Sequence, residues 1–186
     1  MDLATQTDEQ LAVEACREGS DGPAFNCLLA RYRERVWQIC YRLMGNSEDA
    51  GDAAQEVFVR LFLNRGKFEG RSKYSTWVHG VAVRTCLTLR RGRGRRQRHE
   101  TADPRPLEGA VAEKIHGGGQ SIDLMHMLER LSEEDRAMMI LKHAEGYQYD
   151  ELAAMFGLSV SACKMRLSRA REKLNKEFPD YGVGPV

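Results

Sequence analysis

The sequence predicts an all-α protein of two small helical domains joined by a flexible linker, with a helix-turn-helix in the C-terminal domain. Apolar residues recur at three- and four-residue steps through most of the 186 residues. No alternating strand pattern appears, and no Asn-Gly or Asp-Gly hairpin turn joins two apolar runs. A segment with Pro and Gly but few large apolar residues interrupts the helical pattern. We therefore expect domains at 1–98 and 122–186, with the linker at 99–121.

Three helices are expected in the first domain. Apolar side chains form one stripe on a long helix that Gly45 ends. Ser47 is predicted to cap a second helix with acidic residues in its first turn. A third helix begins near Ser75, carries Trp77, and is expected to dissolve into the sequence RRGRGRRQR.

The second domain begins with a short helix, LMHMLERL, and Ser132 is predicted to cap the next one, which Gly146 ends. Two further helices, with Gly157 in the turn between them, are typical of a helix-turn-helix. We predict Val160 to belong to their shared core. The solvent face of the second helix would enter a DNA major groove and contains Ser161, Lys164, Met165, Ser168, Arg169, Arg171 and Lys173.

Charge is unevenly distributed along the chain. There are 28 Lys and Arg against 27 Asp and Glu, so the net charge is only +1. Residues 47–56 contain four acidic groups and no basic one, whereas residues 84–98 contain seven arginines and no acidic one. We expect two oppositely charged surfaces that serve two different partners.

Aromatic residues alternate with cations at the start of the third helix. Phe68, Tyr74 and Trp77 lie among lysines and arginines. Aromatic faces stack on unpaired bases, so this pattern favours an opened nucleic-acid strand over a closed duplex. An equally good interpretation places Trp77 in the core. The arginine run would bind phosphates with a salt-dependent affinity.

Several classes of protein are disfavoured. The five cysteines form no CxxC, which argues against a zinc ribbon or disulfide framework; we expect reduced, mostly buried thiols, with redox sensing as an alternative. No HExxH, phosphate loop or GxSxG is present, so we expect no enzyme, metal or cofactor. No stretch approaches the roughly 20 apolar residues of a membrane helix, and the N-terminus lacks a signal-peptide pattern. We expect a cytoplasmic protein.

Taken together, these motifs resemble the extracytoplasmic-function group of bacterial RNA polymerase sigma factors, over about residues 11–98 and 122–178. DAAQEVFVRLF is similar to the polymerase-binding helix of that family, and KYSTWVHGVAVRTCLTLRR to its promoter-melting, minus-ten-reading segment. YQYDELAAMFGLSVSACKMRLSRAREKL is similar to its minus-thirty-five reader. The resemblance implies an initiation factor that binds core polymerase and promoter DNA, both duplex and melted, with an anti-sigma factor as a further partner.

The resemblance also implies site residues. Contact with core polymerase is implied for Asp49, Asp52, Gln55, Glu56, Phe58 and Leu61. Contact with the melted minus-ten strand is implied for Tyr74, Thr76, Trp77 and Arg84, together with the neighbouring cations Lys73, Arg90 and Arg91. Lys164, Met165, Ser168 and Arg169 match the minus-thirty-five recognition helix, and Ser161 and Arg171 share its predicted face. Arg84 and Met165 stand where smaller polar residues are common in such factors.

Two other functions remain as alternatives. A stand-alone helix-turn-helix regulator that binds duplex operator DNA explains residues 122–178 equally well. It leaves unexplained an acidic helix followed directly by an aromatic and arginine-rich segment. An RNA-binding or nucleic-acid-processing enzyme lacks a recognisable set of catalytic residues.

Overall fold

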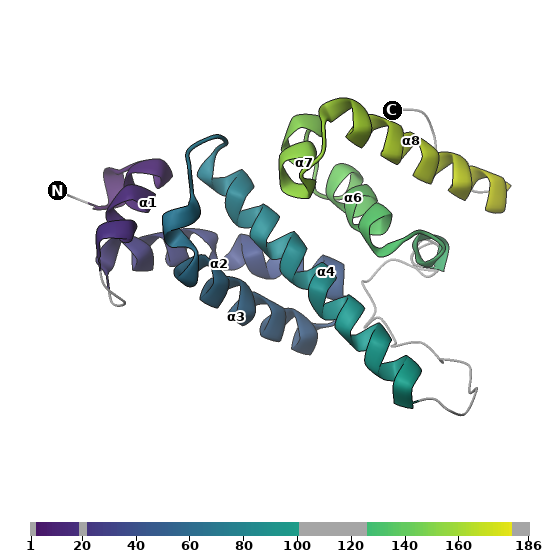
Figure 1. The fold of residues 1–186 in the computed structure, drawn as a ribbon, viewed down its shortest axis with the longest axis horizontal. Helices are drawn as coiled ribbons and strands as arrows, with labels where there is room; N and C mark the ends of the chain where they lie inside the picture. Colours follow the sequence, from purple (N-terminus) through teal and green to yellow (C-terminus); the bar gives the residue numbers. More distant parts are fainter. Residues whose placement is uncertain (1–2, 19–21, 101–125, 180–186) are drawn as a thin grey trace. The chain divides into compact units, whose positions relative to one another are not determined.

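The computed structural model describes residues 3–18, 22–100 and 126–179. The chain divides into two compact units, Met1–Asp103 and Pro104–Val186. In the described ranges every regular element is a helix, which confirms the all-α prediction (Figure 1). None of the helices in these ranges is both long enough and apolar enough to cross a membrane.

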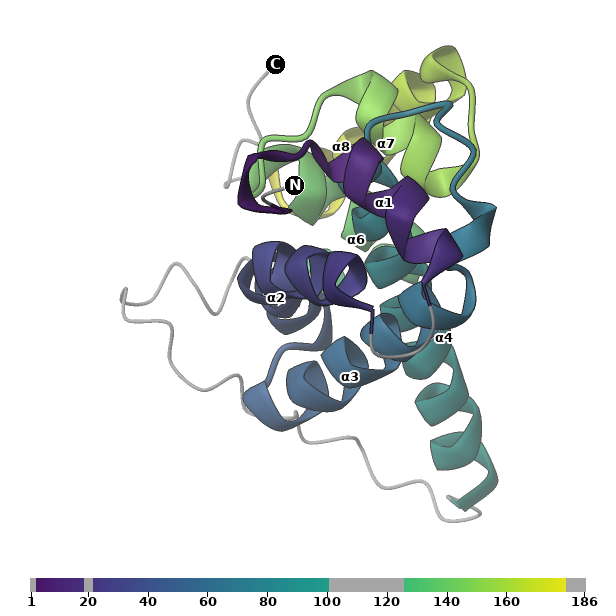
Figure 2. The ribbon, with the colours of Figure 1, turned by 90° about the vertical axis from the view of Figure 1, so that its left-hand side faces the viewer.

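The first unit is built around α2, which contacts α1, α3 and α4. Its elements are η1 (Leu3–Thr5), α1 (Asp8–Arg17), α2 (Pro23–Met44), α3 (Ser47–Leu63), η2 (Arg65–Lys67) and α4 (Tyr74–Glu100). The three longest helices of this unit, α2, α3 and α4, pack side by side (Figures 1 and 2). Fully buried side chains from four helices form one core, among them Leu11, Leu28, Val36, Ile39, Val57 and Val78.

Glycine and asparagine set the connection between α2 and α3. Gly45 ends α2 as predicted, with a left-handed φ of 89° and its N–H donating to Tyr41 O at 2.9 Å. The cap of α3 is Asn46, whose side chain accepts from the backbone N–H of Asp49 at 2.9 Å. The prediction of Ser47 as the cap was wrong by one residue, because Asn46 already has the extended backbone of a cap.

The last helix of the unit, α4, is longer than predicted. It continues through the arginine and glycine run to Glu100, so the prediction that the helix dissolves there was wrong. Arginine is a good helix former, which offsets the two glycines of the run, and Arg90 and Arg93 contact the neighbouring helices. The helix extends two residues into the predicted linker, and positions 101–121 of that linker lie outside the described residues.

The second unit contains a helical turn at 126–129, followed by α6 (Glu133–His143), α7 (Tyr149–Phe156) and α8 (Val160–Glu177). Ser132 caps α6 as predicted, accepting from Asp135 N at 3.2 Å. The helix ends at His143, before the predicted Gly146. Fully buried side chains include Met138, Leu141, Leu152, Met155, Leu167 and Leu174.

The connection between α7 and α8 has the predicted helix-turn-helix chemistry. Gly157 adopts a left-handed φ of 67° at the end of α7, and Ser159 caps α8 by accepting from Ala162 N at 3.1 Å. Val160 is 41% exposed, so its predicted core position was wrong. Val160 shares the helical face of Cys163 and Leu167, but as the first residue of α8 it lies at the end of that stripe, where it remains partly exposed.

Candidate functional site

The residues of α3 predicted to bind polymerase divide between surface and core. Asp52 and Gln55 are exposed, whereas Leu61 is only 3% exposed. Leu61 follows Val57 by one helical turn on the buried stripe, so it lies in the core of the unit, and its contact with a partner stays a prediction. Phe58 is half-buried and lines a small cavity with Phe25 and other core residues.

The exposed apolar residues of α3 were missed by the sequence analysis. Val59 is 53% exposed and Leu63 is 69% exposed. Together with Asp52 and Gln55 they recur at three- and four-residue steps, so the four side chains share one face of the helix. We call Asp52, Gln55, Val59 and Leu63 the α3 strip. The available signal was their position off the buried stripe of Ala50, Ala53, Val57 and Leu61.

Two of the acidic residues of α3 have basic neighbours. Glu56 accepts from Arg60 Nε at 2.6 Å, one turn along the same helix. Asp49, in the first turn of α3, pairs with Arg93 of α4. Hydrogen bonding from Arg93 holds the pKa of Asp49 below its usual value, although burial acts in the opposite direction. The acidic and the arginine-rich segments therefore contact each other.

An aromatic cluster surrounds the start of α4. The ring centroid of Tyr74 lies 5.0 Å from that of Phe68, 5.5 Å from that of Trp77 and 5.7 Å from that of Tyr32. Tyr74 is 3% exposed and Thr76 is 6% exposed, so neither predicted strand contact lies on the surface. Burial raises the pKa of Tyr74, which keeps its hydroxyl protonated. Trp77 is half-buried at the edge of the cluster.

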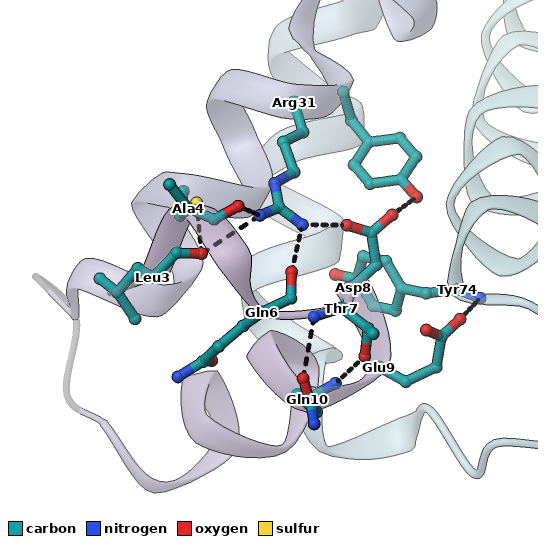
Figure 3. A network of polar contacts seen from close by, with 11 residues as sticks. Leu3, Ala4, Gln6, Thr7, Asp8, Glu9, Gln10, Arg31 and Tyr74 are labelled. Carbon is teal, nitrogen blue, oxygen red and sulfur yellow. Dashed lines mark hydrogen bonds and ion pairs between the residues drawn. The ribbon is translucent and has the colours of Figure 1, made fainter. Parts of the chain in front are cut away.

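A polar network connects α1 to this cluster (Figure 3). Asp8 accepts from Arg31 Nη1 at 2.6 Å and also from the hydroxyl of Tyr32. Glu9 Oε1 accepts from the backbone N–H of Tyr74 at 3.1 Å, although 65 residues separate them. That N–H belongs to the first residue of α4 and has no acceptor within the helix. A carboxylate from α1 therefore caps α4, a contact that no local sequence motif predicts.

The predicted DNA-binding cations of the first unit differ in their surroundings. Lys73, Arg84 and Arg91 are exposed. Arg90 is half-buried and donates through Nη1 to the carbonyl oxygen of Leu43 at 2.6 Å. Leu43 lies in the last turn of α2, where carbonyl groups lack helical partners. Arg90 therefore caps α2, and its contact with DNA stays a prediction.

The predicted recognition face lies along α8. Ser161, Lys164, Met165 and Arg169 are exposed, and Ser168 and Arg171 are half-buried. Met165 is 52% exposed, a large value for an apolar side chain. The ammonium group of Lys164 lies 5.4 Å from the ring centroid of Tyr149. Lys173 is engaged within the unit, donating to Arg130 O at 2.5 Å.

Two family comparisons match the two units. Residues 28–96 match Sigma-70 region 2, and residues 121–174 match Sigma-70, region 4. The ECF RNA polymerase sigma factor SigE of Mycolicibacterium smegmatis is 33% identical over 161 residues, which is 82% of this chain and 60% of that protein. The chain thus spans less than two thirds of the length of SigE. SigW of Bacillus subtilis is 29% identical over 173 residues, 86% of this chain and 91% of that protein.

Solved structures show the same fold. The sigma factor RpoE, in complex with the anti-sigma factor NepR from Bartonella quintana, matches with a TM-score of 0.62 and 24% identity over 82% of this chain and 94% of that one. CnrH, in complex with the cytosolic domain of CnrY, matches with a TM-score of 0.64 and 23% identity over 94% of this chain and 98% of that one. From the paired region 2 and region 4 matches and the identity to SigE, we conclude that the chain belongs to the extracytoplasmic-function group of the sigma-70 family.

Proposed function

We propose that the protein binds core RNA polymerase and directs transcription initiation at specific promoters. It acts as an initiation factor and not as an enzyme, and it works in the cytoplasm with the polymerase. The observation that carries the proposal is the presence, in one chain, of a region 2 match with an exposed α3 strip and a region 4 match with an exposed recognition face.

The α3 strip is the proposed contact with core polymerase. Large apolar side chains that remain exposed in a folded unit commonly mark an interaction surface. Val59 and Leu63 supply apolar area, and Asp52 and Gln55 supply polar groups at its edge. Phe58 and Leu61 support the helix from inside the unit. Asp49 and Glu56 lie beside the strip, each already paired with an arginine.

The surface at the start of α4 is the proposed contact with the melted minus-ten strand. Trp77 offers a half-buried ring for stacking on a base, and Lys73, Arg84 and Arg91 offer charges for the phosphates. Tyr74 and Thr76 are buried beneath this surface and support it. Removing an aromatic ring on which an unpaired base stacks lowers the binding affinity by about 1–3 kcal/mol.

The exposed face of α8 is the proposed reader of the minus-thirty-five element. In helix-turn-helix proteins the first turns of the second helix reach base edges in the major groove, and cations farther along meet phosphates. Lys164 and Met165 are therefore proposed to contact bases. Ser161, Ser168, Arg169 and Arg171 are proposed to contact bases or phosphates along the same face.

An anti-sigma factor is a proposed further partner. The solved relatives RpoE and CnrH were determined in complex with the anti-sigma factor NepR and with the cytosolic domain of CnrY. A fold of the same kind supports a similar mode of regulation for this chain.

Initiation from a promoter pool tests the proposed function. The purified chain is added to sigma-free core polymerase and fragmented genomic DNA, and the 5′ ends of the transcripts are sequenced. A sigma factor yields a limited set of start sites that share upstream sequences. A stand-alone regulator binds duplex fragments but yields no start sites above those of core polymerase alone, and this result would refute the proposal.

A further inference from the structure

Two lysines from different helices share one aromatic ring in the second unit. The ammonium nitrogen of Lys142, in α6, lies 4.5 Å from the ring centroid of Tyr149, the first residue of α7. That of Lys164, in α8, lies 5.4 Å from the same centroid. Both distances fall within the range of about 6 Å in which a cation is attracted to the face of an aromatic ring.

The first of these lysines holds the ring in place. Lys142 Nζ also donates to the carbonyl oxygen of Tyr147 at 3.2 Å, so its ammonium group is fixed at two points. Tyr149 itself is half-buried. The start of α7 is capped separately, because Gln148 N donates to Glu151 Oε2 at 2.9 Å. The Tyr149 ring is therefore contacted by a lysine that is itself anchored to the backbone, and the ring is not needed for the cap of its own helix.

The second lysine gains a defined position from the ring. Lys164 is exposed and lies about one turn into α8, and its long side chain would otherwise sample many rotamers. Contact with a fixed ring restricts those rotamers before DNA arrives. A pre-positioned cation loses less conformational entropy when it binds a base edge.

We propose that Tyr149 is a positioning residue for promoter recognition, whose ring holds the ammonium group of Lys164 ready to contact a base of the minus-thirty-five element. The inference rests on the proposed function, in which Lys164 reads bases. It adds a specificity determinant that lies on α7, outside the recognition helix.

Selection from a promoter with a randomised minus-thirty-five element tests the inference, using polymerase assembled with the full chain. The variants are Lys164→Ala, Tyr149→Phe and Tyr149→Leu. The phenylalanine keeps the ring face, so we expect the parent's sequence preference. The leucine removes the ring, and we expect about a threefold loss of discrimination at the positions that Lys164→Ala relaxes. In the Lys164→Ala background, Tyr149→Leu should cause no further loss at those positions.

A fluorinated series separates the electrostatic role from packing. Replacing Tyr149 with phenylalanine and then with trifluorophenylalanine preserves the shape of the ring but weakens its negative face. Discrimination should fall with fluorination, and circular dichroism should show unchanged helix content. The inference is refuted, while the proposed function stands, if fluorination and Tyr149→Leu leave the preferred sequence unchanged or weaken binding to all promoter sequences equally. If Lys164→Ala leaves the preference unchanged, base reading by Lys164 fails, and the inference fails with it.

Discussion

Arg93 of α4 pairs with Asp49 in the first turn of α3, so the arginine-rich segment and the acidic segment neutralise each other at one point. From sequence position alone, the acidic and the arginine-rich segments are expected to form two separate surfaces. Asp49 also accepts from Asn46 Nδ2 at 2.9 Å, which links the pair to the cap of α3. The junction of α2, α3 and α4 is thereby held by an ion pair and by the Arg90 contact with Leu43 O.

Breaking this pair should make the first unit less stable near neutral pH but not in acid. The pKa of Asp49 is lower in the folded chain than its ordinary value, so its contribution is complete above about pH 4 and is lost as the pH falls through the folded pKa. Asp49→Asn should cost less than about 1 kcal/mol, because Arg93 is partly exposed. Both tryptophans, Trp37 and Trp77, lie in this unit, so urea unfolding followed by tryptophan fluorescence reports it alone. An equal difference between parent and variant in strong acid would contradict the prediction.

The buried histidine of α4 should produce a separate pH effect. Burial, with a smaller effect of Arg35, lowers the pKa of His79 from 6.5 to about 4. The unfolded chain therefore binds a proton that the folded chain rejects, and stability falls as the pH decreases from about 6.5 to about 4. The expected loss is about 2–3 kcal/mol for a group that is 7% exposed. The same fluorescence measurement should show a flatter pH profile for His79→Gln. An unchanged profile in that variant would assign the slope to another group.

Neighbouring arginines in α4 should respond differently to substitution. Arg90→Met removes the donor to Leu43 O and should cost about 1 kcal/mol of stability. Arg91→Met, at an exposed position, should leave stability nearly unchanged but lower the salt slope of promoter binding by about one. Urea unfolding and binding titrations at several salt concentrations measure the two effects. A reduced salt slope for Arg90→Met would assign that residue to the DNA contact as well.

The remote cap of α4 should depend on an acceptor and not on charge. Glu9→Leu leaves the N–H of Tyr74 without its partner and should cost about 1 kcal/mol, whereas Glu9→Gln keeps an amide oxygen there and should cost less. Amide hydrogen exchange at Tyr74 provides the local readout, because only the leucine variant should exchange faster. Equal exchange in the two variants would indicate that water or another group caps the helix.

Local sequence patterns predicted the helix-turn-helix well. Gly157 supplies the left-handed turn that the sequence predicts between the two helices, and it acts on backbone groups within a few residues. The buried stripe of α2 follows from the helical period in the same way. These features depend on neighbours in sequence, so the sequence alone was sufficient to identify them.

The pairing of distant residues could not be predicted in this way. Glu9 reaches Tyr74, and Asp49 reaches Arg93, only because α1, α3 and α4 pack around α2. The division of α3 between core and surface also depends on packing. Leu61 and Leu63 have the same chemistry, and residue type alone does not distinguish them; the helical period places Leu61 on the buried stripe and Leu63 off it, and packing against α2 buries the first and leaves the second exposed.

The exposed residues of α3 provide the sharpest test of the polymerase contact. Removal of an interface anchor commonly costs about 2 kcal/mol or more, roughly thirtyfold in Kd. Val59→Ser and Leu63→Ser should weaken binding to core polymerase by about this factor. Neither should change the urea midpoint of the first unit by much, because more than half of each residue's surface is already exposed.

Two controls distinguish this contact from a loss of folding or a general loss of apolar surface. Val13→Ser alters an apolar residue of α1 that is 51% exposed but does not belong to the α3 strip, and it should leave polymerase affinity unchanged. Leu61→Ala creates a cavity in the core and should cost about 2–5 kcal/mol of stability. Affinity can be measured by competition with the labelled parent chain for core polymerase. Residues that form the contact must respond selectively. The polymerase surface therefore lies elsewhere on the unit if Val13→Ser weakens binding as much as Leu63→Ser does. The same conclusion follows if Val59→Ser and Leu63→Ser bind core polymerase like the parent chain.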